Sequence, residues 1–211
     1  MQNKIQKNIV SLFGEIISEW EYDHETMNER FGRVSFRIER QSGTSDVLPL
    51  MVSEKFLEVG EIKVGTFATV NGAFRSYNIQ DEAGKSHLVL VVFVDDLFLF
   101  TADHDMWWKN EALLDGYICK PTIYRKTPLG REVTDFILAV NRAYGKTDYI
   151  PCICWGRNAK FAAHFKVGDM VTVSGRLQSR EYQKTMEDGT VINRTAYELS
   201  ARSVDRISIA V

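Results

Sequence analysis

The stretch Leu12-Phe-Gly-Glu-Ile16 returns 102 residues later as Leu114-Asp-Gly-Tyr-Ile118, with the leucine, the glycine and the isoleucine in the same places. At the same spacing, Val34-Ser-Phe-Arg-Ile38 matches Phe136-Ile-Leu-Ala-Val140, and alternate positions are apolar in both. The following turn also recurs, through the pairs Gly43 and Gly145, Asp46 and Asp148, and Pro49 and Pro151. The chain of 211 residues is therefore a duplication of one unit of roughly 100 residues.

Alternating apolar residues predict five strands in each copy. In the first copy we expect strands at 9–20, 31–40, 46–53, 66–78 and 87–95, with a short helix over 54–59. In the second copy we expect them at 112–120, 132–142, 147–155, 169–182 and 193–206, with a helix over 157–165. Five strands with one helix between the third and the fourth are the plan of the OB barrel. The prediction is an all-β protein of two tandem five-stranded OB-fold barrels.

The predicted domains are residues 1–96 and 110–211, joined by a linker over 97–109. The linker begins with Leu97-Phe-Leu-Phe100, and a flexible Gly/Ser tether would carry no such apolar residues. We therefore expect a packed connection between the two domains.

Several classes of protein do not fit the sequence. No signal peptide and no membrane span of about 20 apolar residues is visible, which predicts a cytoplasmic protein. The cysteines Cys119, Cys152 and Cys154 have neither redox nor zinc-site spacing, so no metal is expected. No nucleophile stands with a base, and the paired carboxylates, as at Asp95-Asp96, fit turns and surfaces. We expect no enzymatic activity and no cofactor.

The charge is unevenly distributed between the two copies. Residues 1–109 carry 11 Lys and Arg against 17 Asp and Glu, whereas residues 110–211 carry 15 against 11. The second copy is thus basic within a chain of net charge −2, which indicates that it faces a polyanion.

Aromatic residues alternate with cations in the second copy. Tyr149 and Trp155 lie six residues apart on one strand, so their side chains share a sheet face, while Ile150, Cys152 and Cys154 face the core. Single-stranded nucleic acids bind by stacking bases on such rings and by phosphate contacts to Lys and Arg. Aromatic residues on strands more often belong to a core, and a solvated face would explain the cations but not the interleaved rings. The predicted binding residues are Arg142, Tyr144, Lys146, Tyr149, Trp155, Arg157, Arg176, Gln178, Arg180, Tyr182 and Lys184.

Three segments of the second copy resemble the bacterial single-stranded-DNA-binding protein family. Asp148–Arg157 resembles the third strand of that family, and Val173–Lys184 and Arg194–Ala201 resemble the fourth and fifth strands. The resemblance implies that Tyr144, Tyr149, Trp155 and Tyr182 stack on bases. The equivalent positions of the first copy are not aromatic: Ser42, Val47, Ser53 and Ile79. For that copy we expect at most weaker binding, through Arg40, Arg75 and Tyr77.

The resemblance also bears on partners. Family members pool four barrels, which implies a homodimer of this chain. They usually end in an acidic tip that recruits other replication proteins, whereas this chain ends in Arg206-Ile-Ser-Ile-Ala-Val211, which makes that recruitment doubtful. The expected function is non-catalytic coating of single-stranded DNA, with little sequence preference, in replication, repair or recombination. The alternatives are a primosome-type or RNA-binding OB protein and a protein–protein interaction scaffold.

Overall fold

The structure is a computed structural model that describes residues 6–59, 62–80, 84–100, 108–186 and 189–207. Strands predominate, which confirms the prediction of a mostly β protein. No helix in the described ranges is both long and apolar enough to cross a membrane.

Five strands of the first half close into a ring. The strands of this half are β1 (Asn8–Ile16), β2 (Glu21–Thr26), β3 (Glu29–Glu39), β4 (Ser45–Ser53), β5 (Phe67–Gln80) and β6 (Ser86–Phe100). The order around the ring is β1, β5, β6, β4 and β3, and β3 returns to pair with β1. The helix α1 (Lys55–Val59) follows β4.

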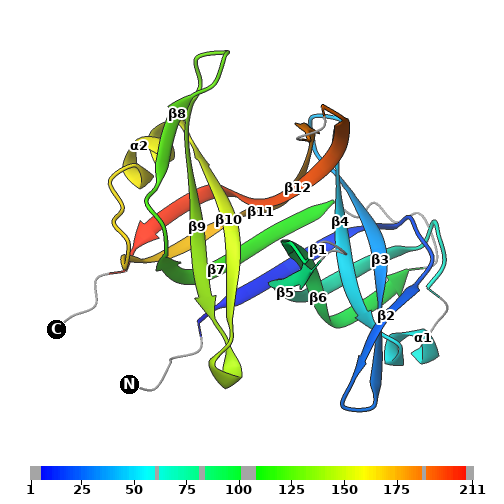
Figure 1. Cartoon of the computed structure of the whole chain (residues 1–211). Coiled ribbons are helices and arrows are strands. Elements are labelled where there is room, and N and C mark those ends of the chain that lie inside the picture. The colour runs from blue at the N-terminus through cyan, green and yellow to red at the C-terminus, as the bar shows by residue number, and fades with distance from the viewer. Residues whose placement is uncertain (1–5, 60–61, 81–83, 101–107, 187–188, 208–211) are drawn as a thin grey trace.

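The second half repeats this arrangement. Its elements are β7 (Lys109–Ile118), β8 (Ile123–Lys126), β9 (Glu132–Asn141), a short 3₁₀ turn (Ala143–Gly145), β10 (Thr147–Trp155), α2 (Gly156–Ala162), β11 (Met170–Thr185) and β12 (Val191–Arg206). The ring runs β7, β11, β12, β10 and β9, and it closes by pairing β9 with β7. The two halves lie side by side (Figure 1).

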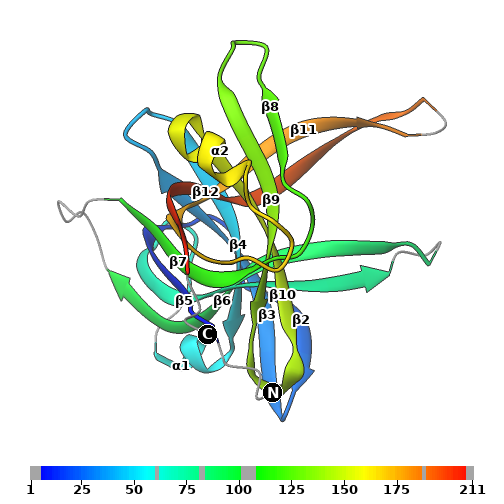
Figure 2. The ribbon, with the colours of Figure 1, turned by 90° about the vertical axis from the view of Figure 1, so that its left-hand side faces the viewer.

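The first strands of the two halves pair with each other. β1 and β7 run antiparallel, from Asn8 opposite Leu114 to Phe13 opposite Lys109. This pairing joins both rings into one sheet, and one continuous cluster of buried apolar residues spans the two halves. The long hairpins β5–β6 and β11–β12 then project to the same side of the molecule (Figure 2).

Reciprocal hydrogen bonds hold each long hairpin against the other half. The backbone N–H of Ser179 on β11 donates to Asp46 Oδ1 (2.9 Å), and its hydroxyl accepts from the backbone N–H of Val47 (3.0 Å). In the opposite direction, Ser76 on β5 donates its N–H to Asp148 Oδ1 (2.8 Å) and accepts from the N–H of Tyr149 (2.7 Å). Both aspartates are buried, so their carboxylates require these partners.

The structure differs from the sequence predictions at several elements. Each half has a sixth strand, β2 or β8, that forms a hairpin with β3 or β9. Both extra strands are short and largely exposed, so they show no alternation of apolar residues. The first strand ends at Ile16 and not at residue 20, and α2 ends at Ala162 and not at residue 165.

The expected linker, 97–109, overlaps strands at both ends. Leu97–Phe100 continue β6 and pair with Phe67–Val70 of β5, and Leu97 and Leu99 pack against the core. Lys109 begins β7, and residues 101–107 lie outside the described part of the chain.

Candidate nucleic-acid interface

The four aromatic side chains expected to stack on bases are all exposed. Tyr144 is 97% exposed, Tyr149 46%, Trp155 39% and Tyr182 38%. Rings that were needed to build the core would be buried, so these four are available at the surface.

β10 separates two of these rings from the core by simple alternation. Tyr149 and Trp155 point outward, whereas Ile150, Cys152 and Cys154 are buried. The hydrogen bond from the N–H of Tyr149 to Ser76 fixes this part of β10 against the first half. Trp155 is the last residue of β10 and stands immediately before α2.

Tyr144 is presented by a strained turn between β9 and β10. Its backbone has φ +59°, in the left-handed region that residues other than Gly, Asn and Asp rarely adopt. Gly145 follows with φ +67°, and the turn lifts the ring of Tyr144 almost completely into solvent. Such conformations persist where the surrounding structure imposes them, and they often occur at ligand-binding positions.

The outward positions of β11 do not all remain available. Gln178 is only 7% exposed, and its amide donates to Glu198 Oε1 at 2.6 Å, so it is occupied within the protein. Arg180 is exposed and lies over the ring of Tyr182, with Cζ 5.8 Å from the ring centroid. Lys184 is half-buried near the end of the strand. The even spacing was therefore a correct guide to the outward face but not to which side chains are free.

The cations near β10 also differ in whether a partner within the protein occupies them. Arg142 Nε lies 3.7 Å from the buried carboxylate of Asp148. Lys146 and Arg157 are exposed, and neither forms an ion pair with any residue that the structure describes. These two are the better placed for phosphate contacts.

In the first half, the side chains expected to bind weakly have partners of their own. Arg75 lies 4.0 Å above the ring of Phe93, and burial lowers the pKa of its guanidinium. Arg33 donates to the hydroxyl of Tyr77 at 2.9 Å and also pairs with Asp23. The third, Arg40, donates to both oxygens of Asp46 and is half-buried.

The outer surface of the first half is closed by apolar side chains. Phe31, Met51 and Val91 are buried there, in positions that alternate with the core residues of β3, β4 and β6. Phe93 packs on Phe31 with ring centroids 5.4 Å apart. Among the described residues of the first half, Tyr22 and Phe98 are exposed rings. Neither stands at one of the four positions that the repeat matches with Tyr144, Tyr149, Trp155 and Tyr182.

Two arginines beside Trp155 were missed by the sequence predictions. Arg131 and Arg202 line a hollow together with Trp155 and Arg180. Arg202 is the extra residue of a β-bulge, because Ser203 pairs with Ser174 while Ala201 pairs with Gly175. A bulge interrupts the alternation of sides, so spacing alone does not place this side chain. Arg131 lies outside the strands, just before β9.

Comparison with known proteins shows what this half is similar to. The model of the single-strand binding protein family matches residues 109–207. The match covers slightly less than half of the chain, and this half is similar to that family. Within the family, Single-stranded DNA-binding protein 2 of Listeria innocua is 40% identical over 81 residues, which cover 35% of this chain and 51% of that protein. Single-stranded DNA-binding protein A of Bacillus subtilis is also 40% identical over 81 residues, which cover 35% of this chain and 47% of that protein.

The chain spans about half the length of these curated relatives. The likeness to a solved family structure extends further. The wild-type single-stranded DNA binding protein from Thermus aquaticus superposes on 98% of this chain and 96% of its own, with a TM-score of 0.75 and 18% identity. That likeness covers both halves and concerns the fold.

Proposed function

We propose that the chain binds single-stranded DNA without catalysis and with little base preference. In this proposal residues 1–96 and 110–211 are two OB-fold barrels in tandem, and the second carries the main binding face. The observation that supports it is the set of four exposed rings, Tyr144, Tyr149, Trp155 and Tyr182, interleaved with cations. Every base has an aromatic face, so stacking tolerates any sequence.

The names of the matched relatives support the choice of ligand, because they are described as single-stranded DNA-binding proteins. We propose the same ligand here, exposed during replication, repair or recombination. We further propose that two chains associate, which would bring four barrels together. Analytical ultracentrifugation tests this association, and a monomer at micromolar concentration would contradict it.

Tryptophan fluorescence tests binding directly. Addition of oligo-dT is expected to quench the emission of Trp155, and high salt is expected to restore it because phosphate contacts release counterions. Absence of both quenching and salt-sensitive binding would favour a protein-interaction scaffold instead. Competition with an RNA of matched sequence measures the preference for DNA, which stacking alone does not set.

The inequality of the two halves is tested by paired double variants. Trp155→Ala with Tyr149→Ala removes two stacking rings, each worth about 1–3 kcal/mol, so affinity for labelled oligo-dT is expected to fall by about 30-fold or more. The matched control, Arg75→Ala with Tyr77→Ala, is expected to bind within a few-fold of the unmodified protein. Equal losses would refute the proposed division of labour.

A further inference from the structure

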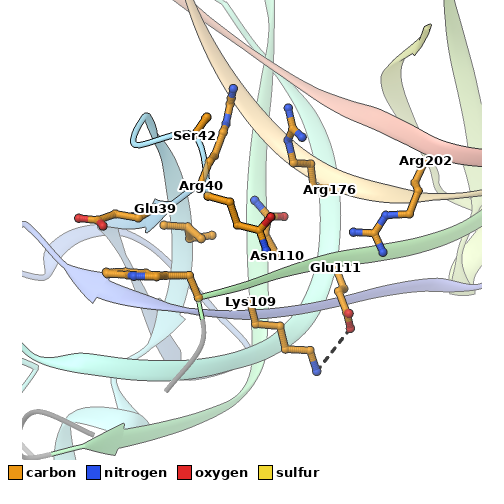
Figure 3. Close-up of a pocket in the computed structure, with 11 residues that line it drawn as sticks. Glu39, Arg40, Ser42, Lys109, Asn110, Glu111, Arg176 and Arg202 are labelled. Carbon is orange, nitrogen blue, oxygen red and sulfur yellow. Dashed lines mark ion pairs between the residues drawn. The ribbon is translucent and has the colours of Figure 1, made fainter. Parts of the chain in front are cut away.

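Two hollows meet at the boundary between the halves. The larger, of about 1050 Å³, reaches from Ser42 and Trp108 to Arg202, and the smaller reaches from Arg202 to Trp155. Both hollows are lined by Arg40, Arg176 and Arg202, so they form one groove. Figure 3 shows these three arginines arranged around the larger hollow, each from a different segment of the chain.

Positive charge predominates in this groove. Its two carboxylates are Glu39 and Glu111, and Glu111 pairs with Lys109 at 3.5 Å. The cations that line it are Arg40, Lys109, Arg131, Arg176, Arg180 and Arg202. Among the residues that the structure describes, no carboxylate forms an ion pair with Arg131, Arg176 or Arg202.

Arg176 lines both hollows and forms no ion pair with any carboxylate that the structure describes. Its Nε is buried without a hydrogen-bond partner in the described part of the chain, and Nη2 reaches only the neutral Gln178, at 3.3 Å. Burial, followed by repulsion from Arg40, lowers the pKa of Arg176, and attraction from Asp46 opposes this shift only in part. An arginine does not lose its proton at physiological pH, so an incoming anion would relieve this repulsion.

The first half contributes its arginine in a fixed position. Arg40 Nε donates to Asp46 Oδ2 at 2.6 Å, and Nη2 donates to the other oxygen. Asp46 Oδ1 also accepts the backbone N–H of Ser179 on β11. Asp46 therefore holds Arg40 of one half against a strand of the other, and the groove requires both halves.

We infer that a single strand leaves the aromatic face at Trp155 and continues through this groove, where Arg40, Arg176 and Arg202 bind its phosphates. The inference rests on the proposed function and extends it, because the first half then contacts DNA through Arg40 and not through its closed outer surface. A row of cations along a groove that begins at a stacking ring fits the sugar–phosphate backbone of a strand better than it fits an isolated anion.

Salt dependence tests the groove. For single strands, each phosphate contact contributes about 0.7 to the slope of log K against log salt, so Arg176→Ala with Arg202→Ala is expected to lower the slope by about 1.4. The control is Arg30→Ala with Arg206→Ala, which removes the same charge from surface pairs with Glu54 and Asp169. Its slope is expected to stay unchanged. Arg40 is left intact because it also secures Asp46.

Three further results are informative. Both double variants are expected to keep the circular dichroism spectrum, and at saturating oligo-dT and low salt both are expected to show quenching of Trp155. Normal quenching with an unchanged slope for Arg176→Ala with Arg202→Ala would overturn the groove alone, whereas no quenching in the unmodified protein would overturn the proposed function and the groove together. Displacement of oligo-dT by millimolar inorganic phosphate would show an isolated-anion site and would also overturn the inference.

Discussion

Two glycines occupy the same place in the two long hairpins. A Cβ on Gly175 would lie 2.1 Å from the backbone oxygen of Ser200, and one on Gly72 would lie 2.0 Å from that of Phe93. Each glycine stands at the bulge of its hairpin. Their match in the repeat thus has a steric cause, since only glycine lacks the atom that would collide.

Gly175→Ala is expected to destabilise the protein by about 1–3 kcal/mol, because the backbone of β11 or β12 must move to admit the methyl group. Ser174→Ala, at the neighbouring position, removes only an exposed hydroxyl contact with Ser203 and should change stability by less than about 0.5 kcal/mol. Urea unfolding followed by circular dichroism measures both. Similar midpoints for the two variants would contradict the steric explanation.

The thiols of β10 are expected to be unreactive. Burial raises the pKa of Cys154 to about 12, and burial also raises the pKa of Cys152 well above the usual value. In the Cys119→Ser variant, Ellman's reagent at about pH 8 should label neither thiol in the folded protein and both after unfolding in guanidinium chloride, since the thiolate is the reactive form. Rapid labelling of the folded variant would contradict the burial of this strand face.

The raised pKa values of these thiols also predict how the stability of the protein depends on pH. The folded protein keeps thiol protons that the unfolded chain loses above about pH 8.5. The contribution of the buried thiols to the free energy of unfolding is therefore fully present below that pH. The free energy of unfolding is therefore expected to decline as the pH rises from about 8.5 toward the folded pKa of Cys154, and guanidinium titrations at several pH values measure the decline.

At the level of elements, two asparagines complete the sheet where strands diverge. β7 pairs with β11 as far as Ala112 opposite Gly175, and Asn110 would next face Leu177. There β7 is paired with β1, and the side chain of Asn110 replaces the missing backbone partner. It donates to the oxygen of Leu177 at 2.7 Å and accepts from its N–H at 2.8 Å.

Asn8 makes the same pair of bonds with Phe74 in the first half, both at 2.8 Å. Each asparagine thus links the strand between the halves to the base of a long hairpin. Asparagine occurs at both positions because its side-chain amide offers a donor and an acceptor, as the peptide group of a neighbouring strand would.

Asn110→Ala should lower the free energy of unfolding by about 1–3 kcal/mol, because it leaves a donor and an acceptor of Leu177 without partners. Asn110→Asp keeps the acceptor but sets a carboxylate oxygen against the oxygen of Leu177, so it is expected to lose at least as much. Thermal unfolding orders the three proteins, and an alanine variant as stable as the unmodified protein would contradict this role.

At the level of the whole molecule, the halves are bound together too extensively to act as separate domains. The β1–β7 pairing, the shared core and the reciprocal bonds of Asp46 and Asp148 all cross the boundary. Unfolding of either half would expose apolar residues of the other and leave buried carboxylates unpaired.

We therefore expect one cooperative unfolding transition. In urea, tryptophan fluorescence and far-ultraviolet circular dichroism should change at the same midpoint, as two-state behaviour requires. Two separated transitions would show that the halves are independent, and the Asp46–Ser179 and Asp148–Ser76 contacts would then contribute little.

Much of the interface could be predicted from residue order alone. The alternation along β10 placed Tyr149 and Trp155 outward, and the aromatic identity of Tyr144 and Tyr182 marked them without any structure. Local patterns succeed here because alternation reports directly which side of a strand faces the core. They failed for Gln178, whose outward position is covered by Glu198, and for Arg202, which a bulge displaces from the pattern.

The sequence by itself determined the duplication, five of the six strands of each half and the concentration of exposed rings in the second, because these depend on residue type and spacing. Only the tertiary structure decided that β1 pairs with β7 and that Asp46 holds Arg40 beside Arg176. The β1–β7 pairs join residues about 100 positions apart and the Asp46–Ser179 bond joins residues 133 positions apart. No local pattern records which distant groups will satisfy a buried carboxylate or border a groove.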